Sequence, residues 1–378
     1  MKINKCQSAG WFTLLIASGS WYGSAGAATL QVCSGCSYST IQGAVNAAAS
    51  NDVINIAAGH YFENVTIAGK TLTLIGSGGG ANGETLVSGQ GGRGPVFTLG
   101  SGTAGDTNQL ITISGVTVSS GNHLGGTAVG GGIQVRAGAY LHLLDSIVTQ
   151  SYAIWGGGIG VNSPGAPATT ITNCAITDNN SPGTPRGHGP GGGIAVLARS
   201  SVSIDHSTIA RNQGHSGGGI WTDTGSTLLM TNTTVTGNTS SAFVTPQGPT
   251  DGDGGGLDAN GDFTISDSFF VNNTSYGVDG GGGIAIVVSD SGPHSITRST
   301  ITHNNVIPGN SGGEGGGIYA YSIISGGFYT LNSSYIEQNL AGYGVWNEEP
   351  LSLSNNGTWI VDNAGGNLCS NSQNAPCE

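Results

Sequence analysis

A tetrapeptide of three glycines and one large apolar residue constrains the fold of this chain more than any other feature. Six copies read Gly-Gly-Gly-Ile and one reads Gly-Gly-Gly-Leu, and they begin at Gly130, Gly156, Gly191, Gly217, Gly254, Gly281 and Gly315. Successive copies lie 26 to 37 residues apart, which is the period of solenoid and array proteins. A 26-residue unit is too short for three strands and a helix, so the period indicates coils of short strands.

A second motif follows each of the last six triplets and ends in Asn. These residues are Asn179, Asn212, Asn238, Asn273, Asn304 and Asn339, and a last copy ends at Asn363. Three residues earlier stands a large apolar side chain, and five earlier stands a small one, Cys174 in the first copy and Ser or Thr in the others. Side chains alternate along a strand, so both positions share a face. Stacking predicts a buried, unpaired Cys174 and a row of Asn side chains that bond one another in left-handed turns.

The segment before the repeats predicts one helix and several strands. Ser39 with Gln42 resembles a capping box, and the apolar face of a helix over 39–49 consists of Ile41, Ala44, Val45 and Ala48. Strand-like runs follow at 53–56, 65–67 and 72–75. With the repeats, they predict an all-β right-handed parallel β-helix with a short N-terminal capping helix that covers the open end of the core.

The first residues have the pattern of a targeting sequence. Lys2 and Lys5 precede an apolar stretch that is too short to span a membrane, and Ala25-Gly26-Ala27 provides small residues for cleavage. We therefore expect a signal peptide at 1–27 and one β-helix domain at 28–378, with an N-terminal cap at 28–52 and a C-terminal tail at 364–378. The chain is then secreted, extracellular or at the cell surface, and the periplasm is also allowed. No transmembrane segment is expected.

Charge and cysteine content agree with export. The chain has 21 acidic and 9 basic residues, a balance that repels nucleic acid. In an oxidising compartment, closely spaced cysteines favour local disulfides. We expect such bonds between Cys33 and Cys36 and between Cys369 and Cys377.

Two stretches resemble known families. The sequence from Tyr38 to Gly78 resembles the N-terminal cap and first coil of the pectin-lyase-like right-handed β-helix superfamily. The alternation of GGGI with I-x-x-N over 130–363 resembles the repeats of polymorphic outer-membrane proteins, although only the copy FVNN has Phe in the second motif. The resemblance implies a fold and an extended binding surface. The superfamily includes lyases, hydrolases and inert surface proteins, so it does not select among them.

The strand after each triplet carries the candidate ligand-binding residues. If its first residue points inward, the second and fourth point outward, which places Trp221, Tyr319, Tyr321 and Trp346 on one face of the solenoid. Aromatic rings stack on the apolar faces of sugars, and nearby polar groups bind the hydroxyls. Ordinary surface aromatics explain the same residues equally well.

Carboxylates near the same aromatic residues are compatible with a catalytic function. Asp223 and Asp258 lie on adjacent coils, two positions apart, and diagonal neighbours in a sheet are about 7–8 Å apart. Inverting glycosidases separate their carboxyl groups by roughly 6.5–9.5 Å. A lyase would need a base beside carboxylates, and neither Arg211 nor Arg298 is expected to have one at the matching place of a neighbouring coil.

The sequence therefore favours a non-catalytic β-helix that binds a polysaccharide or a cell-surface partner along one strand face. A polysaccharide hydrolase or lyase is the alternative, and a structural envelope component is the second. No organic cofactor is expected. Asp251 and Asp253 in a Gly-rich loop leave room for calcium, and the sequence does not predict an oligomeric state.

Overall fold

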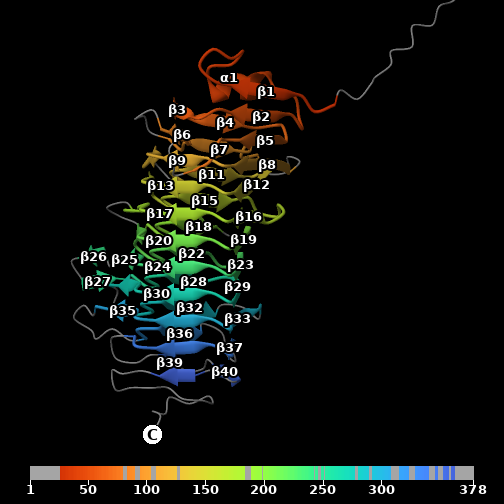
Figure 1. Cartoon of the computed structure of the whole chain (residues 1–378). Coiled ribbons are helices and arrows are strands. Elements are labelled where there is room, and N and C mark those ends of the chain that lie inside the picture. The colour runs from red at the N-terminus through yellow and green to blue at the C-terminus, as the bar shows by residue number, and fades with distance from the viewer. Residues whose placement is uncertain are drawn as a thin grey trace, which may run out of the picture.

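The chain winds into a parallel β-helix whose coils stack along one axis (Figure 1). The computed structural model describes residues 26–79, 83–89, 94–103, 108–125, 128–183, 189–197, 199–241, 243–245, 248–250, 252–276, 280–288, 292–307, 315–322, 328–339, 345–347, 352–356 and 359–361. Within these ranges each coil visits three long sheets in turn, named here sheet 3, sheet 1 and sheet 2 in the order that a coil follows after its glycine triplet.

Sheet 1 has twelve strands in the described part of the chain. They are β1 (Thr29–Val32), β2 (Val53–Ile56), β5 (Leu72–Ile75), β8 (Gln109–Ser114), β12 (Ala139–Leu144), β16 (Thr169–Thr172), β19 (Ser201–Asp205), β23 (Thr227–Thr231), β29 (Asp262–Ser266), β33 (His294–Thr297), β37 (Phe328–Asn332) and β40 (Ser352–Asn356).

Sheet 2 has eleven strands over the same described ranges. They are β3 (Gly59–Phe62), β6 (Thr85–Ser88), β9 (Thr117–Ser119), β13 (Ile147–Thr149), β17 (Ala175–Thr177), β20 (Thr208–Ala210), β24 (Thr234–Thr236), β30 (Phe269–Val271), β34 (Thr300–Thr302), β38 (Tyr335–Glu337) and β41 (Trp359–Val361).

Sheet 3 has ten described strands, most of which follow a glycine triplet. They are β4 (Val65–Ile67), β7 (Phe97–Leu99), β11 (Ile133–Arg136), β15 (Ile159–Asn162), β18 (Ile194–Val196), β22 (Ile220–Thr222), β28 (Leu257–Ala259), β32 (Ile284–Val288), β36 (Ile318–Ser322) and β39 (Val345–Asn347).

Shorter strands lie between sheets 2 and 3. One set consists of β10 (Asn122–His123) and β14 (Tyr152–Ala153), and another of β21 (Gln213–Gly214), β25 (Thr239–Ser240), β31 (Thr274–Ser275) and β35 (Asn305–Val306). An antiparallel hairpin of β26 (Phe243–Thr245) and β27 (Gly248–Thr250) projects from the side of the stack (Figure 1). The coil between β25 and β28 thus accommodates its extra residues outside the core.

Apolar columns run through the interior as the repeat predicts. The position three before each Asn holds Ile176, Ile209, Val235, Phe270, Ile301 and Ile336, all fully buried, and strand pairing places them one above another. The strands after Gly191 and Gly217 pair directly, with Ile194 opposite Ile220. The predicted all-β solenoid is therefore confirmed.

A row of buried Asn side chains joins the coils at one corner. From Asn179 to Asn339 each Nδ2 donates to the Oδ1 of the next Asn at 3.0 Å. The same Oδ1 accepts the backbone N–H of the preceding Asn at 2.9–3.0 Å. Each Nδ2 also donates to a backbone carbonyl of the coil before, at 2.8–3.0 Å. Every amide is thereby satisfied without water, as a buried polar group requires.

The left-handed residue of this turn is the one before each Asn, not the Asn itself as predicted. Asp178, Arg211 and His303 have φ values of 58°, 54° and 56°. The left-handed residue bends the chain at this corner of the coil, so that the side chain of the following Asn points into the core. A second left-handed row precedes the small column between sheets 1 and 2, for example Asp267 at φ 51° and Arg298 at φ 47°.

These left-handed rows also correct the expectation that no base lies opposite a carboxylate. Arg211 forms a bidentate pair with Asp178, at 2.8 and 2.7 Å. Arg298 pairs in the same way with Asp267, at 2.7 and 2.5 Å. The hydrogen bonds to arginine lower the pKa of both carboxyl groups. Equivalent turns stack directly, which is why residues of opposite charge on adjacent coils meet.

Cys174 lies in the column of small side chains, as predicted. The residues of this column form hydrogen bonds between adjacent coils. The Cys174 N–H donates to Ser207 Oγ at 3.1 Å, and the Thr233 N–H donates to Ser268 Oγ at 3.2 Å. The Cys174 thiol donates to the Thr172 carbonyl at 3.2 Å. It is a free thiol and only 4% exposed. Burial raises its pKa to about 12.

The glycine triplets are steric requirements of the stack. Gly217 has φ 58°, a conformation that strains other residues. A Cβ on Gly219 would lie 2.6 Å from the Gly256 carbonyl oxygen of the next coil. The first glycine therefore makes the turn, and the third lets two coils approach.

The N-terminal end of the stack is covered by α1 (Ile41–Ala47) (Figure 1). Its N-cap is Thr40, whose Oγ1 accepts the Gly43 N–H at 3.1 Å, so the predicted cap at Ser39 is wrong. The Glu63 carboxylate accepts the N–H groups of Ile41 and Gln42, which replaces the predicted role of Gln42. Lys70 donates to carbonyls at the other end of the helix. First-coil side chains thus cap both ends, and the predicted buried face is confirmed.

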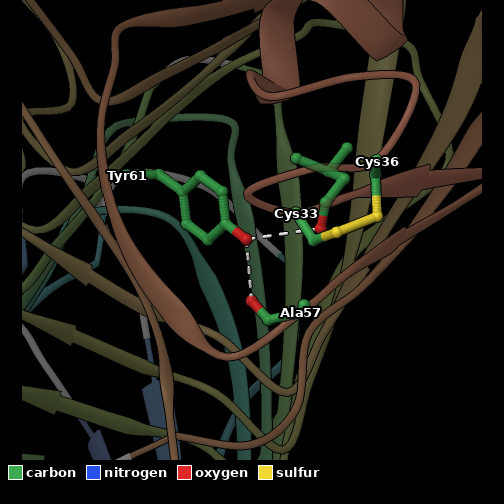
Figure 2. Close-up of a disulfide and its surroundings, with 5 residues drawn as sticks. Cys33, Cys36, Ala57 and Tyr61 are labelled. Carbon is green, nitrogen blue, oxygen red and sulfur yellow. Dashed lines mark hydrogen bonds between the residues drawn. A yellow bond between two sulfur atoms is a disulfide. The ribbon is translucent and has the colours of Figure 1, made fainter.

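The predicted Cys33–Cys36 disulfide is present beside this cap. Figure 2 shows the Tyr61 hydroxyl next to it, donating to the Ala57 carbonyl at 2.9 Å. Tyr61 also donates to the Val32 carbonyl at 3.3 Å, and burial, with the nearby Glu63, raises its pKa. Cys369 and Cys377 lie outside the described residues.

The predicted strands at 53–56, 65–67 and 72–75 correspond to β2, β4 and β5. β3, whose Gly-His-Tyr-Phe sequence does not alternate clearly, was not predicted. Among the described residues, no helix combines the length and the apolar character needed to cross a membrane. Residues 1–25 and 364–378, which include most of the expected signal peptide and the tail, lie outside the described part.

Removal of one amide from the Asn row should destabilise the fold strongly. In Asn238→Ala, the Asn212 side chain and backbone N–H lose their shared acceptor while both stay buried. Each unsatisfied buried group costs about 1–3 kcal/mol, so we expect a loss of about 2–4 kcal/mol in a urea unfolding experiment. Gln213→Ala is the matched control, because Gln213 is exposed on the neighbouring position. Equal midpoints for the two variants would contradict the structural role of the row.

Cys174 should be chemically silent in the folded protein. At pH 8 a thiol with a pKa of about 12 stays protonated, and the thiolate is the reactive form. Maleimide labelling followed by peptide mass spectrometry should leave the Cys174 peptide unmodified until denaturant is added. Cys174→Ser should change the unfolding midpoint little, because Ser occupies this column in other coils. Rapid labelling of native protein would show that the column is open.

Candidate functional site

The second residue of each sheet 3 strand forms one outward-facing column. Strand pairing places Trp221 between Ala195 and Asp258, and it continues through Ala285 to Tyr319 and then to Trp346. The inward neighbours are Ile194, Ile220, Leu257, Ile284 and Ile318, all fully buried. The predicted register of these strands is therefore right. Trp221, Tyr319 and Trp346 share this column, whereas Tyr321 pairs with Val287, two residues further along β36.

This column is much less exposed than its direction suggests. Ala195, Ala285, Asp258 and Tyr319 are 0%, 1%, 5% and 5% exposed. The low exposure of this column has its cause in the glycine triplets, whose first glycine lies close to the following strand. A Cβ on Gly315 would lie 2.8 Å from Tyr319 Cα, and corresponding close approaches occur in every coil with a triplet. The chain thus crosses the outer face of each strand before it turns and enters that strand.

Trp221 is half-exposed on this face. Its ring contacts the ring of Trp155, a contact that the sequence analysis did not predict. The rings of Trp155 and Trp221 meet edge to face, with centroids 5.4 Å apart and planes at 80°. Trp155 directly precedes Gly156 and pairs with Val129 of the preceding coil. Gly160 and Ala195, the smallest residues of the column, occupy the two strands before Trp221. The sequence feature that could have identified Trp155 as a site residue is its position directly before the triplet that begins at Gly156.

Two carboxylates and an amide lie beside Trp221. Asp258 is directly opposite Trp221 in the next strand, and its Oδ1 accepts Asn260 Nδ2 at 2.9 Å. Asp223 follows β22 and is half-exposed, and its Oδ1 accepts the Thr224 N–H at 2.9 Å. The pairing places Asp223 and Asp258 on adjacent coils, with Asp223 one residue beyond the last paired residue, Thr222. Trp155, Trp221, Asp223, Asp258 and Asn260 are called the Trp221 site below.

The other predicted ligand-binding residues do not extend this site as an open platform. Tyr319 is buried, three strands from Trp221. Tyr321 and Trp346 lie in β36 and β39, and their side chains lie outside the described part of the structure. The expectation of an exposed row of rings on sheet 3 is therefore wrong at Tyr319, because the approach to the triplet covers it.

The predicted calcium loop is described only in part. Asp251 lies outside the described residues, and Asp253 is half-exposed just before Gly254. In the ranges that the structure describes, no three or more His, Cys, Asp or Glu side chains gather in a way that could hold a metal ion. A calcium site at this loop stays a prediction.

Exposed aromatic side chains occur on sheet 2, where the sequence did not place them. Phe269 and Tyr335 are 48% and 41% exposed. Both occupy the same outward column, with Thr300 between them. A glycine triplet at 78–80 precedes the sheet 2 strand β6, and a Cβ on Gly79 would lie 3.4 Å from side-chain atoms of Thr117 and Ile147. No triplet directly precedes β30 or β38, the strands that carry Phe269 and Tyr335.

Comparison with known proteins supports the fold. Residues 101–283 match the family model described as the right handed beta helix region. No curated protein matches the chain in sequence. The repeat pattern shared with polymorphic outer-membrane proteins stays a resemblance.

Two solved structures are similar over most of the chain. One is ORF18 of Geobacillus virus E2, with a TM-score of 0.43 and 16% identity over 84% of this chain and 56% of that one. The chain thus spans little more than half of that viral protein. The other is pectate lyase Pel9A, with a TM-score of 0.37 and 15% identity over 91% of this chain and 80% of that one. The matched family segment and the three long parallel sheets show that this chain has the right-handed parallel β-helix fold.

Proposed function

We propose that this chain is an exported, non-catalytic β-helix that binds a polysaccharide through the Trp221 site. The edge-to-face pair of Trp155 and Trp221, both half-exposed, is the observation that supports this proposal most strongly. A ring held by a second ring loses little conformational freedom on binding, and the flat apolar face of such a ring can stack on a sugar.

Polar groups beside the rings suit sugar hydroxyls. Asp223 is half-exposed and its carboxylate is held by the Thr224 N–H, so one oxygen direction is fixed. The Asn260 side chain donates to Asp258 Oδ1, and the Asn260 backbone N–H donates to Thr222 Oγ1 at 3.1 Å. A few oriented polar groups next to an apolar surface are the usual composition of a sugar site.

Export is part of the proposal. The Cys33–Cys36 disulfide supports it, because disulfides persist mainly in oxidising compartments outside the cytosol. The sequence of residues 1–27 supports it independently through its basic start and small-residue cleavage site. A cell-surface component is then the natural partner.

A polysaccharide hydrolase is the second candidate, favoured by one observation. Asp223, directly after β22, and Asp258 in β28 lie on adjacent coils, two positions apart, and diagonal neighbours in a sheet are about 7–8 Å apart. That range fits the roughly 6.5–9.5 Å of inverting glycosidases. Against it, Asp258 is only 5% exposed and is hydrogen-bonded to Asn260.

Trp221→Ala should weaken polysaccharide binding. The ring supplies stacking area worth about 0.5–1.5 kcal/mol beyond its burial, so we expect roughly tenfold weaker binding in affinity electrophoresis against a panel of soluble glycans. The unfolding temperature should fall only slightly, because the ring is half-exposed.

Leu229→Ala is the control, because Leu229 is a 44% exposed apolar residue on β23 of sheet 1. It should bind like the unmodified chain. If no glycan of the panel binds, or if Trp221→Ala and Leu229→Ala bind equally well, the Trp221 site is not the binding site.

Amide substitutions separate binding from hydrolysis. For a binding protein, Asp223→Asn and Asp258→Asn should each keep affinity within about threefold, because an amide still bonds hydroxyls, and no variant should release product. Release of reducing ends or unsaturated sugars by the unmodified chain, lost in either variant with affinity preserved, would instead establish a hydrolase or lyase.

A further inference from the structure

We infer that the outer face of sheet 2 is a second binding surface, which takes an extended, neutral polysaccharide chain. It is independent of the Trp221 site, because it lies on a different sheet and shares no residue with it. Its two outward columns are called the sheet 2 strip. The first runs through Ala175, Thr208, Thr234, Phe269, Thr300 and Tyr335. The second runs through Thr177, Ala210, Thr236, Val271 and Thr302.

Two rings stand out from this strip. Phe269 and Tyr335 are 48% and 41% exposed, while Thr300 between them is only half-exposed. Parallel strands are about 4.8 Å apart, so the two rings are roughly 9.6 Å apart along the axis of the solenoid. In an extended β-linked glycan, alternate sugars present the same face to the same side. A chain laid along the axis can therefore stack every second sugar on a ring.

The charge of the strip selects a neutral ligand. Between Ala175 and Tyr335 in the first column, and between Thr177 and Thr302 in the second, the columns contain no Asp, Glu, Lys or Arg. The nearest guanidinium groups, Arg211 and Arg298, are already held by Asp178 and Asp267 in bidentate pairs. An acidic polymer would find no free base there and would approach a chain with 21 acidic and 9 basic residues. Threonine hydroxyls can bond sugar hydroxyls without such a charge.

The left-handed turns border the strip with fixed polar groups. Asp267 and Arg298 lie two residues before Phe269 and Thr300, and their side chains are 39% and 58% exposed. On the other side Thr302 Oγ1 bonds His303 Nδ1 at 2.9 Å. These groups are held by neighbouring residues, so little freedom is lost when they contact a ligand. A flat apolar centre with polar borders is the arrangement that a sugar chain requires.

The test uses the full chain and defined polymers. Binding to cellohexaose, barley β-glucan, xylan and polygalacturonate is measured by affinity electrophoresis and calorimetry in a Trp221→Ala background, which removes the ring of the Trp221 site. This parent chain is compared with Phe269→Ala, Tyr335→Ala and the double variant made in it. We expect binding to at least one neutral β-linked glycan and none to polygalacturonate. Each single variant should weaken that binding about tenfold, as the loss of one stacking contact does, and the double variant should lose it. The two single variants and the double variant should keep the unfolding temperature of the parent chain, because both rings are exposed.

Leu229→Ala, made in the same background, is the control. It should leave binding to the sheet 2 strip within about twofold, because Leu229 lies on β23 of sheet 1. The inference is overturned if the double variant binds neutral glycans like its Trp221→Ala parent, or if no neutral glycan binds. It is equally overturned if polygalacturonate binds through the same rings, or if ultracentrifugation shows that the rings instead hold two copies of the chain together.

Discussion

The buried row of Asn side chains is the interaction on which the rest of the structure depends. Each amide is satisfied only when the next coil places its own Asn directly below, at strand spacing. An amide without that partner would be a buried, unsatisfied polar group. The row therefore fixes the register of the coils from Asn179 to Asn339, and with it their apolar columns and the small column of Cys174. Extra residues must leave the stack, as the β26–β27 hairpin does.

The glycine triplets decide which outer faces are available for function. Because the chain folds back over each sheet 3 strand before entering it, outward residues such as Tyr319 and Asp258 lose contact with solvent. Trp221 stays half-exposed, and its ring contacts Trp155 from an earlier coil. On sheet 2 no triplet directly precedes β30 or β38, and Phe269 and Tyr335 on these strands are 48% and 41% exposed. The same repeat that builds the core thus closes one face and leaves another open.

Both proposed surfaces follow from the one-dimensional character of the fold. Equivalent positions recur at constant spacing along the axis, so any outward column is a linear array. A linear array suits a linear polymer, since one contact per rung or per two rungs can be repeated along the ligand. Two such arrays on different sheets of one rigid stack would let a single chain engage two polymer strands, which connects the binding proposal with a structural role in an extracellular matrix.

The sequence by itself determined the coil, its inward columns and the Asn row, because these depend on period and on alternation along strands. Residues 53–56, 65–67 and 72–75 were predicted as strands, and Cys174 was assigned to the small column for the same reason. Local patterns were less decisive at the helix cap, where Glu63, distant in sequence, displaced the predicted partner. Only the tertiary structure decided which outward residues are exposed, since exposure depends on where other parts of the chain pass. It brought Trp155 to Trp221, buried Tyr319, paired Arg211 with Asp178 and left Phe269 and Tyr335 on an open, uncharged face. A repeat specifies the direction of a side chain, but the neighbours that cover it come from other coils.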